Sequence, residues 1–212
     1  MIARKPRVWY PGAIYHIMCR GNHRHNVFRD DEDRQIYLYI IREVMESHCF
    51  KLHSYCLMSN HVHLQMETGD IALGPIMKRL NMKYAIFFNK KYRFVGQLLQ
   101  GRCLSEIIDT DRYMIGVSRY IHLNPVVAKM VENPCDYPWS SYLDYIYRRP
   151  TAIVETDKIL GYFLKPRSVR YQKFVEDGLV FGNEETGMSN GIPSNLLLDN
   201  DDEPSLEDDC SI

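Results

Sequence analysis

The sequence predicts an α+β fold, in which an antiparallel sheet with helices on one face is followed by a helical extension and an acidic tail. Two observations lead to this prediction. Four short segments have the two-residue period of strands, and longer segments between them repeat apolar residues every three or four positions, as helices do. Apolar residues make up 45% of the chain, which is enough for a buried core.

The predicted elements follow one another along the first two thirds of the chain. They are a strand at 13–19, a helix at 30–48, strands at 51–58 and 61–67, a helix at 73–92, a strand at 104–108 and a helix at 112–124. The order β-α-β-β-α-β is the split βαβ, or ferredoxin-like, plan. The four strands are therefore expected to form one antiparallel sheet.

Local signals mark where the predicted helices begin and end. The helix at 30–48 starts with a run of four acidic residues, which the positive end of a helix dipole favours. The helix at 73–92 has an apolar face and a basic face. Pro125 is expected to end or kink the helix that precedes it, because proline has no amide hydrogen. A separate short helix is expected at 125–131.

We divide the chain into three parts. The predicted domain is 1–147, the predicted extension is 148–178 and partly helical, and the predicted tail is 179–212. The last fourteen residues contain seven acidic residues and no basic one, so the tail is expected to be disordered and solvated.

The net charge of −1 conceals an asymmetry between the two parts of the chain. Residues 1–150 hold 21 Lys and Arg against 14 Asp and Glu, whereas residues 151–212 hold 5 against 13. A basic body favours nucleic acid as a partner, although many soluble domains share this feature.

Composition also bears on location. No run of 18 or more apolar residues occurs, so no membrane span is expected. The six cysteines include no Cys-x-x-Cys pair, and we expect them to be reduced thiols of a cytoplasmic protein.

Two histidines on the predicted strand at 61–67 are candidate metal ligands. His61 and His63 are two residues apart, so both side chains point to the same face of the strand, while Val62 points to the other. Two neighbouring imidazoles can bind one divalent ion. We expect both histidines on an exposed face and Val62 in the core. Two polar residues on the solvent-exposed face of an ordinary half-buried strand would give the same pattern.

A second candidate group lies in the helix at 112–124. Tyr120 and Asn124 are four residues apart and share one helix face. If this helix lies across the sheet from the two histidines, a phenol and an amide oxygen join two imidazoles, which is a set suited to metal-assisted phosphoryl transfer. A packing role for Tyr120 is the alternative.

Six blocks along the chain carry a resemblance to a known family. They are GAIYHI with RGN at 12–22, LMSNHVHL at 57–64, QGR at 100–102, IDTD at 108–111, RYIHLNP at 119–125 and YPWSS at 137–141. In these blocks and in their order, the chain resembles the REP-associated tyrosine transposases and their insertion-sequence relatives. These proteins are the single-tyrosine branch of the His-hydrophobic-His (HUH) superfamily.

The resemblance implies a function and a site. It implies a single-stranded DNA endonuclease and strand transferase that works through a covalent 5′-phosphotyrosine, with Tyr120 as the nucleophile. His61, His63 and Asn124 would hold a divalent metal ion, Mg²⁺ or Mn²⁺. Single-stranded or hairpin DNA is the implied partner, and both a monomer and a homodimer remain open.

Basic side chains are candidates for contacts with DNA phosphates. These candidates are Arg20, Arg79, Lys83, Arg102 and Arg119. Two other functions remain as alternatives: a nucleic-acid-binding ferredoxin-like module without catalysis, and a zinc-dependent hydrolase. The hydrolase would need a third histidine or a carboxylate, for which Glu67 is the candidate.

Overall fold

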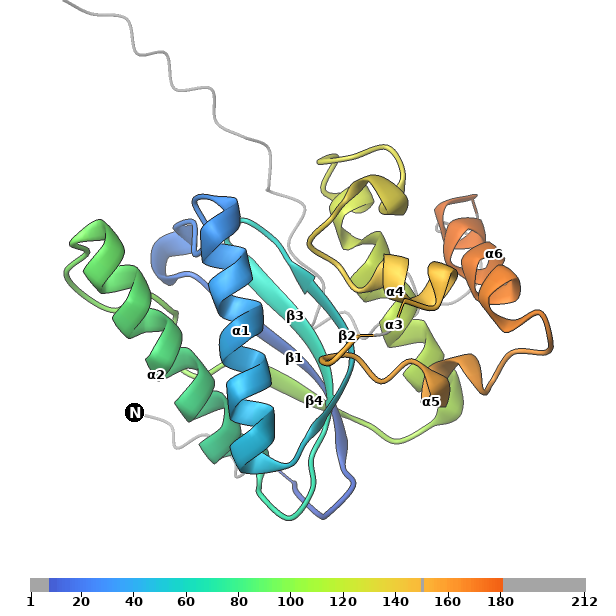
Figure 1. Ribbon diagram of the computed structural model, residues 1–212, viewed down its shortest axis with the longest axis horizontal. Helices are drawn as coiled ribbons and strands as arrows, with labels where there is room; N and C mark the ends of the chain where they lie inside the picture. Colours follow the sequence, from blue (N-terminus) through green and yellow to red (C-terminus); the bar gives the residue numbers. More distant parts are fainter. Residues whose placement is uncertain (1–7, 150, 181–212) are drawn as a thin grey trace, which may run out of the picture.

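A four-stranded antiparallel sheet with the order β2-β3-β1-β4 lies at the centre of the molecule (Figure 1). The computed structural model describes residues 8–149 and 151–180. The strands are β1 (Ile14–Arg20), β2 (Lys51–Leu57), β3 (His61–Glu67) and β4 (Leu104–Ile108). The predicted fold class is therefore confirmed, and each predicted strand lies within one residue of the observed one.

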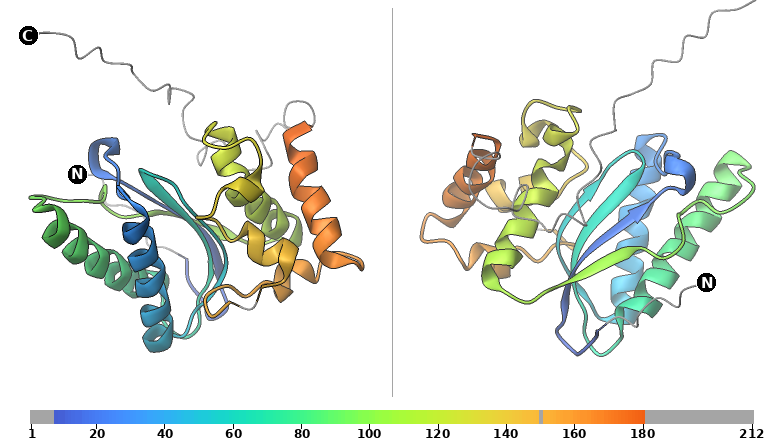
Figure 2. Two further views of the ribbon diagram at one scale, coloured as in Figure 1. Left: turned by 45° about the horizontal axis from the view of Figure 1, so that its top comes forward. Right: turned by 180° about the vertical axis from the view of Figure 1, so that it is seen from behind.

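Two long helices, α1 and α2, cover one face of the sheet (Figure 2). They span Asp31–His48 and Leu73–Tyr92. Asp30 caps α1 by accepting a hydrogen bond from the backbone amide of Asp33 at 3.0 Å, so the acidic run begins the helix as predicted. Val62 faces the core, with 1% of its surface exposed, as expected from its position on the strand.

The opposite face of the sheet is covered by helices that follow β4 (Figure 2). These elements are α3 (Asp111–Val127), α4 (Tyr142–Tyr147), α5 (Asp157–Leu160) and α6 (Arg167–Val180). Helix α3 lies directly on β2 and β3, and α6 packs against α3 and α4. Helices α5 and α6 follow residue 148, and α6 continues to Val180 and supports α3.

Helix α3 runs through Pro125 and ends at Val127, so the separate helix predicted at 125–131 is wrong. Proline removes one hydrogen bond only, the one that its own nitrogen would donate to the preceding turn. The next bonds are present: the Ala128 amide donates to the Asn124 carbonyl, and the Met130 amide donates to the Pro125 carbonyl, both at 2.9 Å. Because Pro125 stands near the end of the helix, these bonds are enough to continue it.

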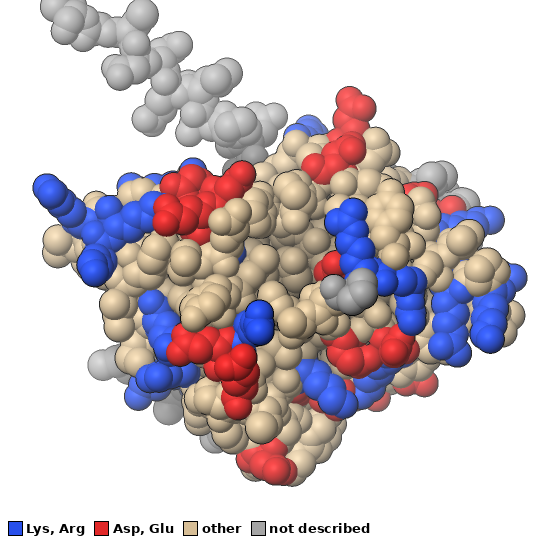
Figure 3. Space-filling model, in the orientation of Figure 1, with Lys and Arg blue, Asp and Glu red and all other residues tan. Residues whose placement is uncertain are grey.

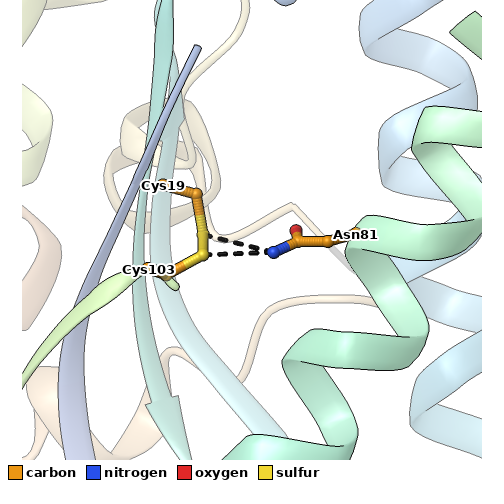
Figure 4. The surroundings of a disulfide bond; sticks show 3 residues. All are labelled: Cys19, Asn81 and Cys103. Carbon is orange, nitrogen blue, oxygen red and sulfur yellow. Dashed lines mark hydrogen bonds between the residues drawn. A yellow bond between two sulfur atoms is a disulfide. The ribbon is translucent and has the colours of Figure 1, made fainter. Parts of the chain in front are cut away.

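A disulfide joins Cys19 to Cys103, which contradicts the expectation that these cysteines are reduced (Figure 4). The antiparallel pairing of β1 with β4 brings Met18 opposite Leu104, and the next pair outward is the two cysteines, with Cα atoms 4.4 Å apart. The Asn81 side-chain amide on α2 lies 3.1 Å from the Cys103 sulfur. The two cysteines are 84 residues apart in sequence, so only the strand register reveals the pair.

The tail predicted at 179–212 lies outside the described residues from 181 onward. Among the described residues, no helix is long and apolar enough to cross a membrane.

Candidate active site

The two strand histidines lie on the face of the sheet that α3 covers, and both are buried. His61 is 3% exposed and His63 is fully buried. Our expectation of an exposed histidine face is therefore wrong. The histidines are buried because α3 covers this face of the sheet. The Gln65 side-chain amide, on the same face of β3, donates to the Met114 carbonyl of α3 at 2.9 Å.

Helix α3 brings Tyr120 and Asn124 to these histidines, which is the condition on which the hypothesis from the sequence depended. The helix begins where the Thr110 hydroxyl accepts a hydrogen bond from the Tyr113 amide. From this start, Tyr120 and Asn124 fall on the buried side. The Asn124 amide oxygen lies 3.4 Å from His61 Nε2, and the Tyr120 ring lies 5.3 Å from the His63 ring.

Burial controls the protonation of these groups. It raises the pKa of the Tyr120 phenol to about 12, and a hydrogen bond with the Asn124 side chain works against this increase. Burial also holds the pKa of His63 well below its usual value, with the charges of His61 and His16 acting in the same direction. His63 is therefore a neutral imidazole at pH 7, which is the form that binds a metal ion.

The ring nitrogens of the two histidines have different surroundings. His61 Nδ1 lies 2.6 Å from the Asn60 amide oxygen, and His63 Nδ1 lies 3.1 Å from His16 Nε2. His63 Nε2 is buried without a hydrogen-bond partner among the described residues. A buried polar atom without a partner is costly, and a cation held by His61, His63 and Asn124 would relieve this cost. These three residues thus fit a divalent metal ion.

No role in the site was predicted from the sequence for His16 or Asn60. His16 is 1% exposed and lies on β1, on the same face as His63. Only the register of β1 against β3 places it there, so no pattern within β1 could have identified it.

The five basic candidates occupy different parts of the molecule. Arg20 pairs with His61 in the β1–β3 register, and its carbonyl accepts a hydrogen bond from the Gln100 amide at 2.8 Å. This bond ties Arg20 to the segment that carries the exposed Arg102. Both side chains therefore belong to segments beside the site.

The other three candidates are not brought to the site. Arg79 and Lys83 are on α2, which covers the opposite face of the sheet, and Lys83 forms a salt bridge with Glu43. The Arg119 guanidinium lies 4.6 Å from the centre of the Phe174 ring on α6. On the face shown in Figure 3, the Lys and Arg side chains of the described residues are interspersed with acidic ones, so they form no single basic surface there.

The residues around the site also bear on the two alternative functions, a zinc-dependent hydrolase and a nucleic-acid-binding module without catalysis. Within residues 8–149 and 151–180, no group of three His, Cys, Asp or Glu residues is placed to hold a metal ion. Glu67, the candidate third ligand of a zinc hydrolase, is bound instead by His53 at 3.0 Å and by Lys158 at 2.6 Å. A nucleic-acid module that uses the sheet surface would need it exposed, whereas α3 covers it.

Comparisons with known proteins bear on the family and on the fold. Residues 10–124 match the family described as "Transposase IS200 like". No curated protein matches the chain significantly. A solved structure described as a REP-associated tyrosine transposase bound to a REP hairpin has a TM-score of 0.61 and 17% identity, over 70% of this chain and 89% of that one. A putative transposase from Deinococcus radiodurans has a TM-score of 0.41 and 19% identity, over 56% of this chain and 95% of that one.

The family match covers more than half of the 212 residues and includes the strand with His61 and His63 as well as the helix positions of Tyr120 and Asn124. The resemblance inferred from the sequence blocks is confirmed, and this chain belongs to the family of IS200-like transposases.

Proposed function

We propose that this chain is a metal-dependent single-stranded DNA endonuclease and strand transferase that acts through a covalent 5′-phosphotyrosine at Tyr120. One observation supports the proposal above all others. Tyr120 and Asn124 on α3 meet His61 and His63 on β3, where the Asn124 oxygen and His61 Nε2 are 3.4 Å apart. A nucleophile and a set of metal-binding atoms thus share one buried space.

His61, His63 and Asn124 would hold the metal ion, Mg²⁺ or Mn²⁺. When bound, the ion neutralises part of the phosphate charge and polarises a non-bridging oxygen. Two imidazoles and one amide oxygen form a mixed nitrogen and oxygen set that accepts several divalent ions, and availability in the cell favours Mg²⁺.

The protein's own contribution to the reaction is the phenol of Tyr120. Its oxygen forms a bond to phosphorus while the bond from phosphorus to the 3′ oxygen breaks. The phenol loses a proton and the departing 3′ oxygen gains one, so the products are a 5′-phosphotyrosine and a free 3′ hydroxyl. A later attack by a 3′ hydroxyl restores the phenol and rejoins the strand without a nucleotide cofactor.

The proposed substrate is single-stranded or hairpin DNA in the cytoplasm. The structural neighbour is described with a bound REP hairpin, and the basic balance of residues 1–150 suits a polyanion. Arg20 and Arg102 are the proposed phosphate contacts, because both belong to segments beside His61.

Trapping the covalent adduct tests this function. The full chain is incubated with labelled hairpin DNA and Mn²⁺ and analysed on a denaturing gel, where a slower-migrating protein–DNA band is expected. Tyr120→Phe should abolish the band. Tyr113→Phe is a matched control on the same helix, because the Tyr113 hydroxyl binds Glu106 at 2.8 Å rather than the site, and it should retain the band. A band that survives in Tyr120→Phe would refute the proposed nucleophile, and one that survives chelation with EDTA would refute the metal requirement.

A further inference from the structure

We propose that His16 and Asn60 are positioning residues that fix the proton of each site histidine on Nδ1, so that both Nε2 lone pairs are available to the metal ion. This inference rests on the proposed function, because it concerns the ligands of that site. Neither residue would touch the ion or the DNA phosphate. Each acts through the imidazole beside it.

The contact between His63 and His16 is enclosed by protein. Both residues are at least 99% buried, and His63 Nδ1 lies 3.1 Å from His16 Nε2. One of the two nitrogens must donate and the other must accept. If His63 Nδ1 donates, His63 Nε2 has a free lone pair. If His16 donates instead, His63 Nε2 carries a hydrogen and cannot bind a cation.

The surroundings of His16 favour the first arrangement. When its Nε2 accepts, its other nitrogen carries the hydrogen. In the strand register, the neighbours of His16 are Gln65 on β3 and Glu106 on β4. The Gln65 amide group is already used, since its nitrogen donates to Met114 and its oxygen accepts from Ser54. His16 Nδ1 is buried without a hydrogen-bond partner among the described residues, and the Glu106 carboxylate accepts from the Tyr113 hydroxyl at 2.8 Å. Glu106 therefore acts on His16 only through its negative charge, which favours a hydrogen on a nearby nitrogen over a lone pair.

The contact between His61 and Asn60 gives the same result for the second ligand. Both His61 nitrogens face amide oxygens, which can only accept, and a neutral imidazole has one hydrogen to donate. The Asn60 oxygen is much closer to Nδ1, at 2.6 Å, than the Asn124 oxygen is to Nε2, at 3.4 Å, so the shorter contact favours the hydrogen on Nδ1. His61 Nε2 then presents a lone pair toward the Asn124 oxygen 3.4 Å away. Two acceptors that face each other repel, and a cation bound by both converts that repulsion into attraction.

The backbone holds Asn60 in place for this task. The Gly21 amide at the end of β1 donates to the Asn60 carbonyl at 2.8 Å, and the Val27 and Phe28 amides donate to the Ser59 carbonyl. A side chain at Gly21 would place its Cβ 2.0 Å from the His25 carbonyl oxygen, so the close turn needs glycine at this position. The turn before β3 is therefore fixed on both sides.

The contacts of His16 with His63 and of Asn60 with His61 would preorganise both imidazoles before the metal ion binds. A free imidazole exchanges its hydrogen between two nitrogens and rotates about its side-chain bonds. Hydrogen bonds to the nitrogen opposite the metal remove both freedoms, and loss of such a partner commonly weakens metal binding by about 10–100-fold.

The tautomers can be measured directly on the metal-free, full-length protein with ¹⁵N-labelled histidine. Two-bond ¹H–¹⁵N NMR spectra at neutral pH distinguish Nδ1–H from Nε2–H. We expect His61 and His63 both as Nδ1–H. Wild-type His63 as Nε2–H, or either ring as an even mixture, would overturn the inference without any variant being needed.

Two pairs of variants test the partners. His16→Leu and Asn60→Ala remove the acceptors, so His63 and His61, respectively, should become tautomeric mixtures, and Mn²⁺ affinity should fall about 10–100-fold. His16→Gln and Asn60→Asp each keep an acceptor oxygen and should restore most of that affinity. Mn²⁺ binding is followed by the loss of the free-ion electron paramagnetic resonance signal, and circular dichroism checks folding.

The outcomes separate this inference from the proposed function. If His16→Leu keeps the His63 tautomer and full Mn²⁺ affinity, the positioning role is wrong although the site stands. If His63→Ala itself binds Mn²⁺ as the wild type does, the metal site is wrong. Equal loss of affinity in His16→Leu and His16→Gln would reduce His16 to a packing role.

Discussion

At the scale of single residues, alternate positions on β3 face opposite sides of the sheet, so one side packs in the core and the other carries the candidate metal ligands. Val62 points into the layer of α1 and α2, while His61 and His63 point toward α3. Because α3 closes over the histidines, their loss has a structural cost that the sequence alone did not suggest. The same burial that keeps the His63 imidazole neutral also makes its hydrogen bond to His16 part of the interior.

Substitution of each position should separate the two roles. His63→Ala should lower Mn²⁺ affinity more than tenfold and cost about 1–3 kcal/mol of stability, because His16 then loses its partner. Val62→Ala should cost about 0.5–2 kcal/mol through lost burial and leave Mn²⁺ affinity unchanged. Urea denaturation and Mn²⁺ titration measure the two effects. A Val62→Ala variant that loses Mn²⁺ affinity as strongly as His63→Ala would show that the wrong strand face was assigned.

At the scale of elements, α3 is fixed to its surroundings by a buried polar network. His122 Nδ1 lies 2.7 Å from the Tyr171 hydroxyl of α6, and His122 Nε2 lies 2.8 Å from the Ser141 hydroxyl. Tyr171 also reaches the Ser118 hydroxyl at 3.0 Å. This network holds the helix that carries Tyr120, so Tyr171 in the extension after residue 148 takes part in placing the proposed nucleophile.

The network predicts loss of stability in acid. Burial lowers the pKa of His122 to about 3, whereas an unfolded histidine has a pKa near 6.5. Above pH 6.5 both states are neutral and stability does not depend on this group. Below pH 6.5 the unfolded chain binds a proton that the folded chain refuses, so the free energy of unfolding falls by about 1.4 kcal/mol per pH unit for each such group.

His122→Gln should flatten this dependence, because glutamine keeps polar contacts but does not titrate. Urea denaturation of both proteins at pH 7, 6, 5 and 4 gives the two slopes. His16, whose pKa burial lowers to about 4, contributes equally to both proteins and cancels in the comparison. Identical slopes would show that His122 is charged in the folded state or exposed.

The disulfide leads to a second prediction at this scale. Cys103→Ser should lower the free energy of unfolding by about 2–4 kcal/mol in the absence of reductant, because the bond closes a long loop in the unfolded chain. In dithiothreitol the variant and the wild type should be equally stable. Cys135→Ser is the control, since Cys135 is not bonded. A difference that persists in dithiothreitol would assign the loss to packing instead.

These elements also show what sequence can and cannot predict here. Strands and helices came within a few residues because their signals, such as the acidic start of α1, are local. The shared helix face of Tyr120 and Asn124 could be predicted because it follows from a four-residue spacing. The burial of His61, the role of His16 and the Cys19–Cys103 bond depend on which strands pair and what covers them, and no local period encodes this information.

At the scale of the whole molecule, acidic and basic residues are distributed unevenly along the chain. Residues 181–212 carry nine acidic residues and no basic one. The described body contains Arg20 and Arg102, the proposed phosphate contacts. A tail that bound to these two arginines would compete with DNA for them.

Deletion of residues 181–212 should leave folding and adduct formation intact and change the affinity for hairpin DNA little. The cut falls after α6, which ends at Val180. Dissociation constants of both proteins at low and moderate salt provide the measurement. Tighter binding by the shortened chain, confined to low salt, would show that the tail docks on the DNA-binding surface, since salt screens such contacts. Loss of folding would show that the segment belongs to the domain.

The enclosure of the site has a kinetic consequence. His63 is fully buried, His61 is 3% exposed and Tyr120 is 6% exposed, so little of the site's surface meets solvent while α3 rests on β3. How often these groups become more exposed depends on the contacts that hold α3 in place, because a local opening must break them first. If the metal ion or the phosphodiester needs such an opening to enter, stronger contacts between α3 and α6 would slow that entry.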